Sequence, residues 1–421
     1  MIPFLVYIAI FVAAFYVVSY IAQKTAKRDY TSLKTVTFGD ESAVRSNRAA
    51  SFISIVTLFV IWGAFTGSKM LPGFMHAPGP FFGDTSFTYT AEANGQRDDA
   101  EVHFRVHRPD ETPEPIEIDP GEGFAKNDSE LVVAWRSKLL RVDRNDEISK
   151  SDGATVVAIN GEPIAPGGSV AVNGGIVTLS DKGTPSFEPD SGLQMEPIWL
   201  PSPEGVVLRT VEIASTGFQG STLWEHLGFS LYRVLLGFLC GALVGIPLGY
   251  AMGLSDWFRG WFDPIVEFMR PVPPLALIPL VIIWAGIGET GKIILLFLAA
   301  LWIMAISARS GVSGVKISKV HAAYSLGASK WQIMRHVIIP NSLPEIFTGA
   351  RVAMGVCWGT VVAAELVAAE KGAGKMIVAA SKFQNTDIVI MGIILIGIIG
   401  FGIDVLMRYA EKILVPWKGK G

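Results

Sequence analysis

Seven long apolar segments limit the folds open to this chain more than any other feature of its sequence. A helix that crosses a bilayer needs about 20 predominantly apolar residues. The segments that approach this length are 2–21, 50–66, 228–253, 264–286, 293–309, 348–369 and 386–407. Charged residues make up 17% of the 421 residues, against roughly 25% in soluble domains. The sequence therefore predicts a polytopic α-helical membrane protein with about seven spans.

The charge of the chain divides it into two parts of opposite sign. Residues 84–215 hold 24 acidic and 11 basic residues, a net charge of −13. The rest of the chain holds 14 acidic and 24 basic residues, a net charge of +10. This difference predicts an acidic, soluble domain inserted into a basic membrane chain.

The inserted region has the composition of short β-strands. β-Branched and aromatic residues alternate or cluster in SFTYTAEA, AEVHFRVHR, ELVVAWRS, TVVAING, GIVTLSD and GVVLRTVEI, and turn-forming residues separate these runs. Such a pattern is typical of an all-β sandwich. The run VNGGIVTLSDKGTPSFEPDSG resembles bacterial cadherin-like or immunoglobulin-like modules. We expect no helix of useful length within 84–215, which excludes a fused solute-binding protein with two α/β lobes.

The first two apolar segments and the loop between them predict the orientation of the chain. Residues 1–22 have no basic start and no A-x-A-like cleavage site, and their apolar run exceeds the 7–15 residues of a signal-peptide core. We interpret them as an extra N-terminal transmembrane helix rather than a signal peptide. The following loop, 23–49, carries six basic residues and is therefore predicted to be cytoplasmic. Residues 50–66 then form a transmembrane helix, which places the N-terminus and the β insert outside and the C-terminus inside.

Two later loops give opposite results when the positive-inside rule is applied to them. The loop 310–347 is basic and is predicted to be cytoplasmic, in agreement with the alternation of spans. The short loop 370–385 is predicted to be external, yet it carries Lys371, Lys375 and Lys382. This loop goes against the positive-inside rule.

The stretch GIGETGKI, residues 286–293, almost matches the phosphate-binding pattern G-x-x-x-x-G-K-[ST]. Ile293 stands where the pattern needs a hydroxyl to bind magnesium, and both flanks are predicted membrane helices instead of a strand and a helix. We therefore interpret the stretch as a Gly-rich external turn between two helices. If ATP drives this protein, another chain hydrolyses it.

Cysteine and histidine give no sign of a metal or catalytic site. Cys240 and Cys357 both fall in apolar segments, and we interpret them as small core residues without a disulfide. His103 and His107 share a face of a predicted strand but stand too far apart for one metal ion, so we expect solvent-facing residues. The sequence has no G-x-S-x-G motif. We expect no catalytic, metal or cofactor site in this chain, and no nucleic-acid partner.

The stretch most suggestive of function is HAAYSLGASKWQIMRHVIIPNSLP, residues 321–344. Ala322 and Ala323 allow close approach to a short amphipathic helix, and Gly327 permits a turn. Apolar surface comes from Leu326, Trp331, Ile333, Met334 and Val337, and the element ends at Pro340 and Pro344. A helix of this kind, within 319–337, suits docking into a groove of another protein. The alternative is an amphipathic helix that rests on the bilayer.

This stretch is similar to the signature loop of importer-type ABC permeases, which has the pattern Glu-Ala-Ala, three residues, Gly, nine residues, Ile, one residue, Leu-Pro. Ala322, Ala323, Gly327 and Pro340 are in register with it, Val337 and Ile339 are conservative replacements, and His321 stands in place of Glu. The wider resemblance covers roughly 216–417 and includes STLWEHLGFSLYRVLLGF and LPEIFTGARVAMGVCWGTVVAAELVAA. It is closest to taurine permeases. The extra first span and the insert depart from the family's usual pattern.

The resemblance implies a type I ABC importer permease core at 224–411, in the bacterial inner membrane. The permease would act as a homodimer with two cytoplasmic ATPase subunits, which bind ATP and Mg²⁺, and with a periplasmic solute-binding protein. The ATPase-coupling residues would be His321, Ala322, Ala323, Gly327, Trp331 and Pro340. Taurine or a related small sulfonate would be the substrate, and nitrate, an alkanesulfonate or a pyrimidine precursor remain alternatives.

Charged residues inside apolar segments are costly and point to function. One hypothesis is that Glu365 binds the ammonium group of taurine while Arg351 binds the sulfonate. The alternative, which we favour for Glu365, is that it orients the helices. Two charge pairs at helical spacing are expected to be structural, Glu267 with Arg270 and Asp404 with Arg408. The prolines 271, 273 and 274 are predicted to kink the entry of the segment 264–286.

Two rival functions come from other classes of protein. An ion-coupled secondary transporter would carry midplane acidic residues on broken, repeated helices, and the sequence has no convincing internal repeat. A sensing or adhesion protein would act through the β insert.

Overall fold

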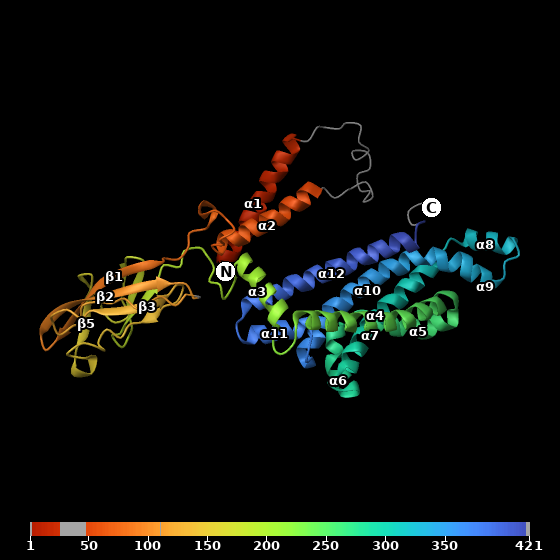
Figure 1. The fold of residues 1–421 in the computed structure, drawn as a ribbon. Helices are drawn as coiled ribbons and strands as arrows, with labels where there is room; N and C mark the ends of the chain where they lie inside the picture. The colour runs from red at the N-terminus through yellow and green to blue at the C-terminus, as the bar shows by residue number, and fades with distance from the viewer. Residues whose placement is uncertain (1, 26–47, 110, 418–421) are drawn as a thin grey trace. The chain divides into compact units, whose positions relative to one another are not determined.

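The computed structural model describes residues 2–25, 48–109 and 111–417. The chain divides into two compact units, Met1–Glu204 and Gly205–Gly421, which Figure 1 colours from red to green and from green to blue. We call them the first and the second unit. The first unit contains two apolar helices and a β-domain, and the second is helical.

The two helices of the first unit match the first two predicted apolar segments. They are α1 (Ile2–Thr25) and α2 (Arg48–Phe65). The apolar stretches Ile8–Ile21 and Ala49–Phe65 are each shorter than 18 residues, so their crossing of a membrane stays a prediction. Most of the predicted cytoplasmic loop 23–49 lies outside the described residues.

In the part of the first unit that the structure describes, nine strands form two sheets. The first sheet has the order β3-β2-β1-β5-β6, with β1 (Gly83–Ala93), β2 (Gln96–His107), β3 (Asp128–Val133), β5 (Thr155–Ile159) and β6 (Glu162–Pro163). The second sheet has the order β4-β9-β8-β7, with β4 (Lys138–Leu139), β7 (Ser169–Val172), β8 (Gly175–Leu179) and β9 (Pro185–Pro189). The strands β1 and β2 form a hairpin through Asn94 and Gly95, both with positive φ, as a two-residue hairpin turn requires.

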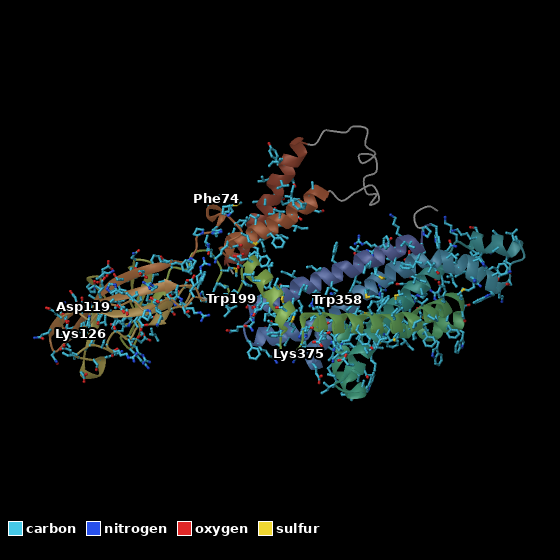
Figure 2. The ribbon with its side chains drawn as sticks, viewed as in Figure 1. Phe74, Asp119, Lys126, Trp199, Trp358 and Lys375 are labelled. Carbon is cyan, nitrogen blue, oxygen red and sulfur yellow. The ribbon has the colours of Figure 1, made fainter. Side chains whose placement is uncertain are left out.

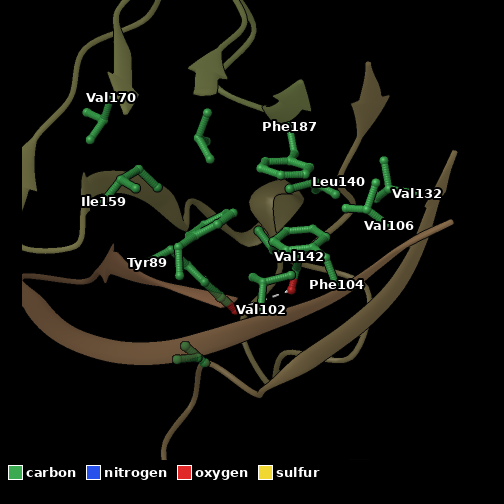
Figure 3. Packing of buried hydrophobic residues seen from close by; sticks show 14 of the residues in the cluster. Tyr89, Val102, Phe104, Val106, Val132, Leu140, Val142, Ile159, Val170 and Phe187 are labelled. Carbon is green, nitrogen blue, oxygen red and sulfur yellow. Dashed lines mark hydrogen bonds between the residues drawn. The ribbon is translucent and has the colours of Figure 1, made fainter. Parts of the chain in front are cut away.

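The core of the β-domain lies between its two sheets. Along β2, buried residues alternate with half-buried ones from Ala100 to His107, as the two-residue period of a strand predicts. Phe104 of β2 stacks on Phe187 of β9 with ring centroids 4.6 Å apart (Figure 3). His103 and His107 fall on the opposite, partly exposed face of β2, where His103 lies 3.4 Å from Glu101.

The prediction that 84–215 contains no helix is wrong at its end. The run GVVLRTVEI, which looked like a strand, lies in α3 (Pro203–Thr216). Its β-branched residues favour strands, but Pro203 and Glu204 occupy the first turn, where proline and an acidic residue favour a helix start. Val206 and Ile213, two turns apart, are buried. The strands end at Pro189, before this helix begins.

Among the described residues of the second unit, four helices are long and apolar enough to cross a membrane, or five spans are possible if one bent pair of helices counts as a span. The four helices are α4 (Leu223–Leu254), α7 (Glu289–Ser313), α10 (Ile339–Ala368) and α12 (Thr386–Leu414). They confirm the predicted segments 228–253, 293–309, 348–369 and 386–407. The short segment between α10 and α12 is not only a loop, since it contains α11 (Ala373–Lys382).

A row of glycines lets α4 lie directly against α7. Gly237, Gly241, Gly245 and Gly249 recur every four residues on α4 and therefore share one face. A Cβ at Gly241 would lie 2.6 Å from the Cβ of Ala300, and one at Gly249 would lie 2.3 Å from the carbonyl oxygen of Ala305. Lipid supplies no hydrophobic driving force for association between helices, so close packing at small residues holds α4 and α7 together instead.

The predicted span 264–286 is not one straight helix. The structure has α5 (Asp256–Met269), a short 3-10 turn at Pro274–Leu277 and α6 (Ile278–Ala285). The two parts are bent by 95°. Proline removes a backbone donor and disfavours helix in the residue before it, so three prolines within four residues break the helix. The kink was predicted from these prolines, but a bend of this size was not.

Candidate functional site

Residues 317–338 form a helical element between α7 and α10 that matches the stretch predicted to dock onto another protein. It consists of α8 (Ile317–Ser325), α9 (Lys330–Ile333) and a π turn at Met334–Ile338. Gly327 separates α8 from α9 with a φ of +79°, a backbone conformation that favours glycine. Ser329 then starts α9 in a capping box with Gln332, which satisfies two otherwise unpaired backbone donors. We call residues 317–338 the α8–α9 element.

The α8–α9 element exposes large apolar side chains. Leu326 is 88% exposed and Trp331 is 69% exposed. Leu326 lines a hollow of about 340 Å³ together with Gln332 and His336, among others. His321 and Ala322 are exposed, and Ala323 is half-buried. Such a surface, with apolar knobs around a hollow, is suited to contact another macromolecule.

The last residue predicted for coupling, Pro340, lies at the start of α10. Its carbonyl oxygen accepts a hydrogen bond from the indole Nε1 of Trp417 at 3.0 Å. The end of the chain after α12 is therefore tied to the point where the α8–α9 element enters α10. A displacement of this element would reach α10 and the segment after α12 together.

A group of charged residues around Arg233, which we call the Arg233 cluster, was predicted only in part. Arg233 of α4 has a side chain only 1% exposed, and the side chain of Glu365 of α10 is 0% exposed. Arg233 Nη1 donates to Glu365 Oε1 at 2.7 Å. Arg233 Nε and Nη2 donate to the two carboxylate oxygens of Glu289, the first residue of α7, at 2.6 and 2.7 Å. This bidentate geometry is the strong form of an Arg–carboxylate pair. Arg233 thus joins α4 to both α7 and α10.

The carboxylate of Glu365 is occupied by protein donors. Its Oε1 also accepts from Ser230 Oγ at 2.7 Å, and its Oε2 accepts from the backbone N–H of Gly374 at 2.9 Å. A Cβ at Gly372, whose φ is +149°, would lie 2.4 Å from the Glu365 carboxyl group. The carboxylate therefore orients the turn from α10 into α11. These contacts favour the helix-orienting role for Glu365.

The same cluster includes Lys371, one of the three lysines of the loop 370–385. Lys371 Nζ donates to Glu225 Oε1 at 2.7 Å, and the carbonyl oxygen of Lys371 accepts from Arg233 Nη1 at 2.7 Å. At the other edge, Lys292 Nζ donates to Glu289 Oε1 at 2.9 Å. Lys292 and Glu289 both come from GIGETGKI. Residues 286–288 of this stretch form the predicted turn between two helices, whereas the residues from Glu289 onward already belong to α7.

The structure does not bring Arg351 and Glu365 together. They are 14 residues apart on α10, which corresponds to about 21 Å along a helix. Arg351 Nε instead donates to Asp404 Oδ1 of α12 at 3.1 Å. The predicted pair of Asp404 with Arg408 is confirmed at 2.7 Å. The predicted pair of Glu267 with Arg270 is also confirmed, at 3.7 Å, although Arg309 approaches Glu267 more closely, at 2.9 Å.

Arg233 and Glu289 are the members of this cluster that sequence reasoning missed. Arg233 is the one charged residue in the apolar segment 228–253. A lone charge in such a segment must find a partner inside the protein or a water-filled cavity, and this signal was available. Glu289 lies in GIGETGKI, a stretch that we compared with a phosphate-binding pattern and interpreted as a turn, so its pairing with Arg233 was not predicted.

The chain matches known proteins over about half of its length. Residues 241–414 match the family model described as "Binding-protein-dependent transport system inner membrane component". The chain is 48% identical over 227 residues, 54% of this chain and 82% of the other, to "Taurine transport system permease protein TauC" of Escherichia coli (strain K12). It is 39% identical over 52% of its length to 81% of "Putative aliphatic sulfonates transport permease protein SsuC" of the same strain. It is 32% identical over 52% of its length to 82% of "Nitrate import permease protein NrtB" of Synechocystis sp..

Proposed function

Because the chain belongs to the family of binding-protein-dependent transport system inner membrane components, we propose that it is the permease subunit of an ATP-driven importer for taurine. The observation that carries this proposal is the 48% identity to a taurine permease across 82% of that protein. Identity to a sulfonate permease is 39% and to a nitrate permease 32%. Alkanesulfonates and nitrate are therefore the alternative substrates within the family.

In this proposal the chain provides the path and a partner provides the energy. The α8–α9 element would fit into a groove of a cytoplasmic ATPase subunit, with Leu326 and Trp331 as its apolar contacts. ATP would bind one conformation of the ATPase better than the other and so shift a two-state equilibrium. The α8–α9 element would carry this shift into α7 and α10, which it connects directly.

During this movement, the Arg233 cluster would hold α4, α7 and α10 together at the side away from the α8–α9 element. Arg233 binds Glu289 at the start of α7 and Glu365 near the end of α10, while α4 packs against α7 through its glycine row. These three helices would therefore move as one body. A rigid body of this kind transmits a displacement at the α8–α9 element to the far end of the helices.

The rest of the assembly follows the same proposal. The α8–α9 element would face the cytoplasm, which places the turn GIGETGKI and the Arg233 cluster near the external face. A solute-binding protein would deliver the substrate there, and two copies of the chain would enclose the path. The β-domain would lie on the external side, as the charge of the flanking loop predicts.

Uptake by a reconstituted complex tests this function. The chain would be purified with its ATPase, placed in liposomes and supplied with its solute-binding protein and radiolabelled taurine. We expect uptake that requires ATP, is blocked by vanadate and persists with a protonophore. Uptake of nitrate or an alkanesulfonate but not of taurine would refute the proposed substrate. Uptake that a protonophore abolishes and ATP does not support would indicate a secondary transporter.

A further inference from the structure

A hollow of about 350 Å³ separates α10 from α12. On α10 its lining includes Met354, Gly355 and Trp358, and on α12 it includes Gly400, Ile403 and Met407. These positions recur at three- and four-residue intervals, so each helix turns one face toward the hollow. Trp358 is labelled on α10 in Figure 2. The indole Nε1 of Trp358 donates to the carbonyl oxygen of Ile396 at 3.0 Å, which fixes its ring against α12.

The hollow has the composition of a site for a small solute. Sites for small molecules enclose about 300–1,000 Å³ and combine apolar and aromatic walls with a few polar groups. Here the walls carry two methionines, an isoleucine and a tryptophan, and the polar groups are Arg351 and Asp404. A solute of seven non-hydrogen atoms, at about 30 Å³ for each water-sized atom, needs about 210 Å³.

The two charged residues at the hollow, Arg351 and Asp404, are paired with other side chains but remain partly exposed. Arg351 Nε donates to Asp404 Oδ1 at 3.1 Å, and its Nη1 only approaches Glu411 Oε2, at 4.0 Å. Asp404 Oδ2 accepts from Arg408 Nη2 at 2.7 Å. The side chains of Arg351 and Asp404 remain 29% and 33% exposed. Charged groups inside a membrane do not face lipid without a large cost, so a polar occupant would stabilise this exposed edge.

We propose that the hollow between α10 and α12 binds a small zwitterion with a sulfonate and an ammonium group, through Arg351 on one side and Asp404 with the ring of Trp358 on the other. This inference rests on the proposed function and names the residues that would hold the substrate during its passage. Arginine binds the oxygens of an oxyanion with its fork of donors. A carboxylate and an indole face both attract an ammonium group.

The balance of charge favours a zwitterion over a simple anion. Arg351 and Arg408 supply two positive charges, and Asp404 and Glu411 supply two negative charges. A zwitterion leaves this sum at zero, whereas an anion leaves an uncompensated charge in a low-dielectric region, which is costly. The site therefore predicts weaker binding of ethanesulfonate or nitrate than of taurine.

Gly355 offers a way to fill the hollow without disturbing the packing. A Cβ at Gly355 would meet no atom within 4 Å. Gly355→Val would therefore place its methyl groups into the hollow and exclude a solute. Gly359 is one turn further along α10, is also free of neighbours within 4 Å and is not part of the lining. Gly359→Val is thus the matched control, with the same helix propensity change.

Equilibrium binding to the permease–ATPase complex in nanodiscs tests the site. Radiolabelled taurine would be used without the solute-binding protein, so that the permease is the binding partner measured. We expect Gly355→Val to abolish saturable binding and Gly359→Val to leave it unchanged. Arg351→Gln should weaken it by about tenfold or more, the effect of losing a hydrogen bond to a charged group. Asp404 keeps Arg408 as a partner in that variant, so misfolding is not expected.

The possible results separate this inference from the function on which it rests. Taurine uptake at the wild-type rate by both Gly355→Val and Arg351→Gln would overturn the site and leave the permease function intact. A wild-type complex that takes up nitrate but not taurine would overturn both. Recovery of a tightly held lipid from the wild type, but not from Gly355→Val, would assign the hollow to lipid and also overturn the site.

Discussion

Replacement of Arg233 by Met is the perturbation whose result follows most directly from the structure. The variant leaves the carboxylate of Glu365, whose side chain is 0% exposed, with Ser230 and the Gly374 N–H but with no cation. Removal of one partner of a buried charge pair costs about 3–5 kcal/mol. A domain of 150–250 residues loses about 2–4 °C of Tm for each kcal/mol. We therefore expect the Tm of the second unit to fall by roughly 6–20 °C.

A second substitution separates the charge effect from lost packing. In Arg233→Met with Glu365→Gln, the orphaned charge is gone, so this double variant should be more stable than Arg233→Met alone. Glu289 keeps Lys292 as a partner at 2.9 Å in both variants. The control is Arg259→Gln, because the side chain of Arg259 is 59% exposed and its nearest carboxylate, Asp263, is 3.9 Å away, which predicts a change below about 1 kcal/mol. The assay is thermal unfolding of the purified chain in detergent, followed by tryptophan fluorescence. A double variant no more stable than the single one would refute the argument from buried charge.

Three further predictions follow from other parts of the molecule. Gly241→Leu should lower the free energy of unfolding by at least about 1–3 kcal/mol, because the new side chain would overpack against Ala300. Gly228→Leu on the same helix is the control, since its Cβ would meet nothing within 4 Å. Thermal unfolding compares the two variants, and equal losses of stability would contradict the packing argument. Trp331→Ala should abolish ATP-driven uptake with an unchanged Tm, because its side chain is 69% exposed; retained uptake would exclude it from coupling. Burial raises the pKa of Asp128 in the β-domain from 3.8 to about 7, so the protonated form of this residue favours the folded state. Its contribution to the free energy of unfolding should be fully present below about pH 4 and be lost as pH rises from about 4 to 7. Thermal unfolding of the wild type and Asp128→Asn isolates this contribution: the wild type should lose stability relative to the variant as pH rises towards about 7, and a difference that does not change with pH would contradict the prediction.

The apolar segments were sufficient to predict four helices of the second unit, because the length and composition of a bilayer span constrain a sequence strongly. They were insufficient for 264–286, where the prolines were noted but the angle of the bend depends on how α5 and α6 pack. The end of the insert was misjudged for a related reason. Val206, Val207 and Val211 favour strands by composition, whereas the start of α3 at Pro203 determines the helix.

The candidate site was predicted in part. The spacing of Ala322, Gly327 and Pro340 was sufficient to indicate the α8–α9 element, because a turn between two short helices is a local feature. The charged partners of Glu365 and Arg351 were not predictable, since they are more than 50 positions away on other helices. Spacing along one helix indicates which face a residue shares, but it does not identify the neighbouring helix.

The claim on which the account depends is that the α8–α9 element is held by a separate ATPase subunit on the cytoplasmic side. A photo-reactive amino acid at position 331, introduced into the assembled complex in native membranes, measures this directly. The account predicts a high-yield cross-link from position 331 to the ATPase subunit, because the side chain at this position is exposed and would face that partner. Cross-links to lipid alone, or labelling of position 331 by a membrane-impermeant reagent added from the external side, would contradict it.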